Sequence, residues 1–220
     1  MKKLNPIWFL VGFNLIFLIA RTWIIPPDVL DSLNLQLQAT LATIGPPGYL
    51  GVVALFAICA FFFIPLMIPL NILCGAAWGP ATGTAVAIVG VTAGCYASTL
   101  SVRHVFTGMR QSIENRATAQ QIIKRVNRHG PIIVLLVRLA FVVPYLIQNM
   151  VLAVTKIDIH RLAALTAIGG LPAAAIYSFL GAGLVRAETL STLAVYLAVP
   201  LILLIVLSVL LRFLERRYDR

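Results

Sequence analysis

The stretch "VRLAFVVPYLIQNM", residues 137–150, places polar side chains in a segment that is otherwise apolar enough for hydrocarbon. Arg138, Pro144, Gln148 and Asn149 stand close together in it. An arginine in the core of a bilayer costs about 2.5–3.5 kcal/mol on insertion scales. Amides, freed carbonyl groups, water or a ligand anion can offset this cost, and the forked guanidinium suits a phosphate. The alternative is that Arg138 reaches back to the cytoplasmic face or caps hairpin carbonyls.

Composition identifies the class of protein that must position these groups. Hydrophobic residues make up 60% of the chain and charged residues 11%, against roughly 25% charged residues in soluble domains. The mean hydropathy is +0.98. Residues 4–20, 49–70 and 190–211 are apolar runs that match or approach the roughly 20 residues needed to cross a bilayer. The sequence therefore predicts a polytopic membrane protein.

The distribution of the charges predicts the topology. The net charge is +10, and the basic residues gather near the N-terminus, between residues 103 and 128, and after residue 211. Basic loops face the cytoplasm, so both termini and the 103–130 loop are expected on that side of a cell membrane. These charges suit anionic lipid headgroups, which we expect as partners, and they argue against a nucleic-acid partner.

Apolar length, prolines and topology together predict the elements. We expect an all-α protein with about four full transmembrane helices and two re-entrant hairpins that enter from opposite faces as an inverted repeat. Two kinked full spans are the alternative to the hairpins. The expected segments are a transmembrane helix (1–25), an outer-face segment (26–48), a hairpin (49–78), a crossing helix (81–102), a basic cytoplasmic linker (103–130), a second hairpin (131–155), a crossing helix (161–183), a C-terminal transmembrane helix (190–211) and a basic tail (212–220).

Further candidate residues lie at the breaks and along the crossing helices. Pro65 and Pro69 break the first hairpin, and Asn71 follows them much as Asn149 follows Pro144. Both asparagines are expected to hydrogen-bond unwound backbone or, alternatively, to contact substrate. Asp158 is expected to cap the helix that begins near His160, with a proton relay as the alternative. Small residues at helical spacing predict close helix packing: Gly75, Gly79, Gly83, Gly90, Gly94, Gly170 and Gly181.

Two long stretches carry a family resemblance. "PLMIPLNILCGAAWGPATGTAVAIVGVTAGCYAS" and "VRLAFVVPYLIQNMVLAVTKIDIHRLAALTAIGGLPAAAIYSFLG" resemble the VTT domain of the DedA-like membrane family, also called SNARE-associated Golgi proteins. The resemblance covers residues 49–185. It implies facing re-entrant hairpins and movement of phospholipids or polyprenyl phosphates across bilayers. Phe141 replaces a proline of the family pattern, and residues 49–102 contain no Asp or Glu, so the chain resembles the branch without acidic residues in its first hairpin.

Three classes of function remain open at this stage. Translocation or scrambling of lipids is expected first, and a secondary carrier for a small anion or another solute, or a non-transporting scaffold for membrane integrity, are the alternatives. An enzyme is not expected, because the chain has no paired carboxylates and no G-x-S-x-G motif. The histidines lack metal-ligand spacing, and the three cysteines lie in apolar segments as buried hydrophobes, so no metal or cofactor is expected. Residues 106–128 are expected to form a surface helix on anionic lipid.

Overall fold

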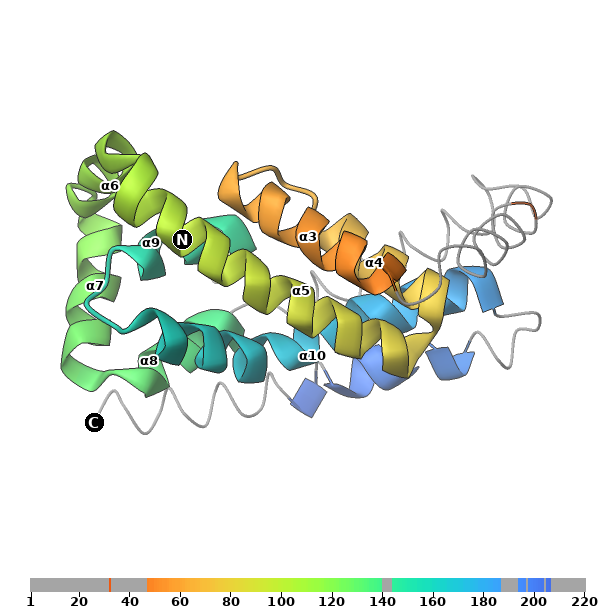
Figure 1. Cartoon of the computed structure of the whole chain (residues 1–220). Helices are drawn as coiled ribbons and strands as arrows, with labels where there is room; N and C mark the ends of the chain where they lie inside the picture. Colours follow the sequence, from red (N-terminus) through yellow and green to blue (C-terminus); the bar gives the residue numbers. More distant parts are fainter. Residues whose placement is uncertain are drawn as a thin grey trace. The chain divides into compact units, whose positions relative to one another are not determined.

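The computed structural model describes Ser32 and residues 47–139, 144–186, 194–196, 198–203 and 205–206, and every element in these residues is helical (Figure 1). The predicted segments 1–25 and 212–220 lie outside the described residues. Segment 26–48 is described only at Ser32 and at residues 47 and 48, and segment 190–211 only at residues 194–196, 198–203 and 205–206, all helical.

Proline and glycine residues mark several helix boundaries. Pro47, Pro80 and Pro131 each occupy the first position of a helix, where a missing N–H costs no hydrogen bond. The elements are α3 (Pro47–Phe61), α4 (Met67–Trp78), α5 (Pro80–Leu100), the π-helical turn η2 (Ser101–Val105), α6 (Thr107–Glu114), α7 (Ala117–His129), α8 (Pro131–Leu139), α9 (Tyr145–Ala153) and α10 (Ile159–Arg186).

The apolar run 49–70 breaks near Pro65, the first proline within it. Residues 62–66 separate α3 from α4, with Phe63 in the left-handed region at φ 57° and Pro65 just before α4 begins. Pro69 lies inside the first turn of α4, so the break overlaps the expected Pro65–Pro69 interval at Pro65 and extends ahead of it. Gly79 lies between α4 and α5 at φ 84°. Its backbone conformation favours glycine, so at this position a turn requirement replaces the packing role expected from sequence.

Two helices of the described part of the chain are long and apolar enough to cross a membrane. They comprise residues 80–105 (α5 with η2) and 159–185 of α10, at 26 and 27 residues. Large apolar side chains on them, including Val89, Ile168 and Leu171, are exposed on the protein surface. An apolar surface of this kind suits contact with lipid. The described part of the chain is thus consistent with a helical membrane protein.

The chain divides into two compact units, and the one that contains Arg138, here the Arg138 unit, comprises residues 46–70 and 85–174. In it α7 packs on α8 and α9 (Figure 1). The apolar side chains of α6 and α7 enter two buried clusters with residues of η2, α9 and α10; they include Ile113, Ala119, Ile122, Ile123 and Val126. The apolar face of 106–128 is therefore covered by protein, unlike that of a helix that inserts into lipid.

The second unit, here the Gly75 unit, has residues 71–84 and 175–186 as its continuous described part. A Cβ atom at Gly75 would collide with the Ser178 carbonyl, and one at Gly181 with the Ile72 carbonyl. The backbones of α4 and α10 therefore meet with no room for a side chain.

The other glycines predicted to pack closely differ in how much space surrounds them. Gly83, Gly90 and Gly94 lie in close contact with neighbouring residues, whereas a Cβ at Gly170 would meet only side-chain atoms, at 3.4 Å or more.

Candidate functional site around Arg138

Arg138 lies in the last turn of α8 and is 5% exposed. Among the described residues it is the only charged side chain in the buried class. The whole chain has seven acidic residues, and the Arg138 unit contains only Glu114 and Asp158. Glu114 forms an ion pair with Arg110 at the surface, and Asp158 is exposed. No carboxylate of this unit therefore neutralises Arg138.

The neighbours of the guanidinium are neutral groups from two other helices. Its Nη2 donates a long hydrogen bond to the Cys95 thiol of α5, at 3.5 Å from Sγ. Its central carbon lies 5.2 Å from the centre of the Tyr145 ring at the start of α9, a cation–π contact. Within the part of the chain that the structure describes, Nε and Nη1 have no hydrogen-bond partner. The interval 140–143, which is not described, reads Ala-Phe-Val-Val and contributes no charged side chain.

Tyr145 connects Arg138 to the polar residues of α9. Pro144 occupies the N-cap position of this helix with extended ψ of 138°, and the Tyr145 hydroxyl donates to the Val91 carbonyl at 2.7 Å. Asn149 follows one turn later on the same face. It is 1% exposed, and neither its Oδ1 nor its Nδ2 has a hydrogen-bond partner among the described residues. Gln148, also buried, precedes it.

Helix α10 is the fourth helix that contributes to this site, after α5, α8 and α9. Thr166 donates to the Cys95 sulfur at 3.3 Å and to the Leu162 carbonyl at 2.7 Å. One turn further, Gly169 lies so close to α8 that a Cβ there would be 2.7 Å from the Arg138 Cβ. Four helices, α5, α8, α9 and α10, thus supply the surroundings of one buried cation. The sequence pointed to Arg138, Pro144 and Asn149, but gave no reason to single out Cys95, Tyr145, Thr166 or Gly169.

The other predicted site residues lie elsewhere. Pro65 and Pro69 are exposed in the α3–α4 region and are not among the described neighbours of Arg138. Asn71 is buried in the Gly75 unit, where its carbonyl accepts a hydrogen bond from the Ser178 hydroxyl at 3.4 Å. Asp158 caps α10, as expected: its Oδ1 accepts from the backbone N–H of His160 at 2.9 Å and of Arg161 at 3.1 Å. The Arg161 N–H in particular holds the pKa of this carboxyl below its usual value.

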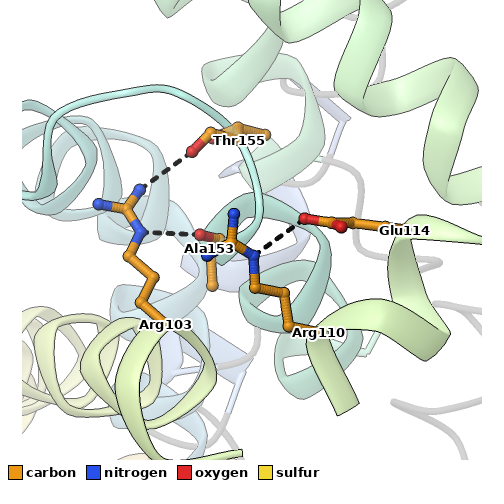
Figure 2. Close-up of polar contacts among 5 residues, drawn as sticks. All are labelled: Arg103, Arg110, Glu114, Ala153 and Thr155. Carbon is orange, nitrogen blue, oxygen red and sulfur yellow. Dashed lines mark hydrogen bonds and ion pairs between the residues drawn. The ribbon is translucent and has the colours of Figure 1, made fainter. Parts of the chain in front are cut away.

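A second arginine of the Arg138 unit is bound entirely by backbone carbonyls. Arg103, in η2, donates from Nε to Ala153 at 2.8 Å, and from Nη2 to Thr155 at 3.1 Å and Ile157 at 2.8 Å. Figure 2 shows the first two of these bonds beside the exposed Arg110–Glu114 pair. These carbonyls belong to the end of α9 and its connection to α10. Arg103 therefore fixes the polypeptide that follows the candidate site.

No other chemistry is evident in the described residues. No group of three or more His, Cys, Asp or Glu side chains there could hold a metal ion. Tyr96 and His160 share a hydrogen bond of 2.6 Å between the hydroxyl and Nδ1 at an exposed position. The arrangement that stands out is a buried guanidinium with open donors, which can bind an anion.

Comparison with known proteins gives one finding. The profile of the VTT domain matches residues 64–183, which is 120 of the 220 residues of the chain. No characterised protein and no solved structure matches the chain. The matched range contains every residue named above as a neighbour of Arg138.

Proposed function

The chain belongs to the VTT-domain family, and on that basis we propose that it translocates lipids across the bilayer, with Arg138 binding the headgroup phosphate. The family is membrane-associated and transporter-like. The observation that carries the proposal is a buried guanidinium that no carboxylate of its unit neutralises and whose Nε and Nη1 lack partners among the described residues.

The geometry of the guanidinium supports phosphate as the ligand. An arginine has five N–H donors: one on Nε and two each on Nη1 and Nη2. The Cys95 thiol takes one hydrogen of Nη2, which leaves the other beside either Nε or Nη1. One complete edge of the fork is therefore free to hold two phosphate oxygens in parallel. A lysine in this position would offer a point charge without that fork.

Short helices support re-entrant hairpins. A span of the bilayer needs about 20 residues of helix, whereas α8 and α9 have 9 residues each, and α3 and α4 have 15 and 12. We therefore infer that α3–α4 and α8–α9 enter and leave on the same side of the membrane and that α5 and α10 cross it. We further propose that the protein lies in the plasma membrane with its two termini and α6–α7 in the cytoplasm, because basic loops favour that side of the membrane.

Burial of Arg138 implies a change of conformation during transport. Arg138 is only 5% exposed, so a lipid headgroup cannot reach its guanidinium in this conformation. A protein that binds its ligand only in a minor open state loses apparent affinity in proportion to the population of that state. Lipid movement should therefore be limited by the change of conformation that exposes Arg138.

The test uses the full chain in liposomes with fluorescent phospholipid or polyprenyl phosphate, and measures how much label becomes accessible to a membrane-impermeant quencher. Wild type should expose the label from both leaflets. Arg138→Ala should reduce the rate at least tenfold, Arg138→Lys should give an intermediate rate, and Arg110→Ala should match wild type, because Arg110 is exposed.

The variants also separate the alternatives. A scaffold without transport predicts that Arg138→Ala lowers the unfolding temperature and that wild type moves no lipid. If folded wild type leaves both lipids in place, lipid translocation is wrong, and uptake of small anions becomes the function to test.

A further inference from the structure

The charge around Arg138 limits which anions the site can hold. Its guanidinium contacts the Cys95 thiol and the Tyr145 ring. The Thr166 hydroxyl contacts the same thiol, and the Asn149 amide is buried one turn beyond Tyr145. None of these groups carries a charge when protonated or in its amide form. On α7, which packs on α8, Lys124, Arg125 and Arg128 are exposed. Arg103 of η2 is half-buried, and its guanidinium is bound to the carbonyls of Ala153, Thr155 and Ile157. Among the described residues, the side chains that contact Arg138 therefore add no second positive charge to the site.

We propose that this site selects anions with one negative charge over anions with two. It would therefore prefer phosphodiesters to doubly ionised phosphomonoesters, and it would bind a monoester such as polyprenyl phosphate mainly in its singly ionised form. For lipid substrates the inference rests on the function proposed above. A bound phosphodiester would bring the net charge of the buried site to zero. A doubly ionised phosphomonoester would leave one negative charge uncompensated where water is excluded, which is unfavourable in a medium of low dielectric constant.

The size of the discrimination follows from the cost of one uncompensated charge. On insertion scales, a single charge at the centre of a bilayer corresponds to a factor of roughly 50 to several hundred in equilibrium constant. Partial hydration would lower this factor. We expect a preference of at least about tenfold for the singly charged ligand.

Asn149 adds a second requirement that a phosphodiester can meet. Its amide presents a donor and an acceptor, both without partners among the described residues. The donor suits a second phosphate oxygen. The acceptor suits a hydroxyl or ammonium hydrogen, which the esterified headgroup of a phosphodiester lipid carries beyond the phosphate. A simple phosphomonoester lipid has no such group to offer when it is fully ionised.

The first experiment measures binding without transport. Dibutyl phosphate, a diester with one charge, and monobutyl phosphate, a monoester, are added to the purified full chain in detergent, and the unfolding temperature is followed. At about pH 8 the monoester is doubly ionised, because its second pKa is about 6. Dibutyl phosphate should raise the unfolding temperature of wild type and of Arg110→Ala, but not of Arg138→Ala. Monobutyl phosphate should have at least tenfold weaker effect at that pH and approach the diester at about pH 5.5. Equal effects of the two probes at about pH 8, or no effect of either, would overturn the inference.

The second experiment compares lipids with identical acyl chains in liposomes, phosphatidylglycerol as the diester and phosphatidic acid as the monoester. Phosphatidylglycerol should move at least tenfold faster at about pH 8, and the difference should shrink at about pH 5.5, where phosphatidic acid gains a proton. A constant rate for phosphatidylglycerol controls for titration of Cys95 and Tyr145, the ionisable groups that face Arg138. Equal rates at about pH 8, lost in Arg138→Ala, would refute the charge preference and leave lipid translocation standing. Selective binding of dibutyl phosphate without movement of either lipid would refute translocation and leave the charge preference standing.

Discussion

Replacement of Arg103 by alanine tests how the connection after α9 is held. The side chain donates three hydrogen bonds, at 2.8, 3.1 and 2.8 Å, to the carbonyls of Ala153, Thr155 and Ile157. A hydrogen bond from a charged donor contributes about 1.5–3 kcal/mol when buried. Arg103 is half-buried, and water can replace part of each bond once the side chain is gone. We therefore expect Arg103→Ala to lower the free energy of unfolding by about 2–3 kcal/mol in total, close to the value of one fully buried bond.

Arg110→Ala is the matched control, since it removes the same charge from the next helix. Its ion pair with Glu114 spans one helical turn, with side chains 46% and 42% exposed, and such pairs contribute about 0.3–0.5 kcal/mol. The assay is unfolding of the purified proteins in one detergent, followed by circular dichroism against denaturant. Arg103→Lys should fall between wild type and Arg103→Ala, because one ammonium cannot reach all three carbonyls. Equal stability of Arg103→Ala and Arg110→Ala would refute the reasoning.

Three further predictions follow from contacts of single residues. Gly169→Ala would place a Cβ 2.7 Å from the Arg138 Cβ. We therefore expect it to lower the free energy of unfolding by about 1–3 kcal/mol and to slow lipid movement. Gly170→Ala is the control and should leave transport unchanged. Gly75→Ala would bring a Cβ against the backbone of Ser178, so this variant should not accumulate as folded protein. Gly51→Ala is the control, because the space around Gly51 is open and the variant should fold. The pKa of Asp158 is lowered in the folded chain, so its cap stabilises α10 above the usual carboxyl pKa and is lost as the pH falls through the folded value; Asp158→Asn should abolish this acid-dependent decrease in unfolding temperature.

The sequence predicted the elements well where one physical rule dominates. Apolar length and prolines indicated helices near α3, α4, α5, α8, α9 and α10, because an apolar backbone in a membrane must form its hydrogen bonds within helices. The basic charges of 106–128 indicated a surface segment, and the charged side chains there are exposed. Whether its apolar face contacts lipid or protein was not predictable. Amphipathic spacing shows that a helix has an apolar face, but the same spacing serves lipid and protein, and here Ile113 and Val126 pack on protein.

Individual contacts in the candidate site depend on geometry that a sequence does not display. Arg138 was recognisable, since a charge in an apolar segment is costly wherever it lies. The approach of Cys95 and Gly169 to it depends on how α5 and α10 cross α8, which their small residues permit without specifying. Gly79 followed the spacing of the packing glycines, yet its φ of 84° assigns it to a turn. Equal spacing in a sequence thus conceals different backbone conformations.

Comparison of the two arginines gives the strongest argument that Arg138 serves a ligand. Both lie in apolar helices of the same unit, and the chain supplies Arg103 with three carbonyl acceptors. Arg138 contacts a thiol and the face of a ring. It does so although Pro172 in α10 leaves the carbonyl of Ile168, the residue before Gly169, without its helical N–H partner. A structural arginine gains stability from each acceptor, so loss of Arg103 should reduce stability. A ligand-binding arginine keeps its donors free at a cost to stability, so loss of Arg138 should reduce lipid movement while the unfolding temperature stays level or rises. A fall in unfolding temperature for Arg138→Ala as large as that for Arg103→Ala would contradict this distinction and assign both residues a structural role.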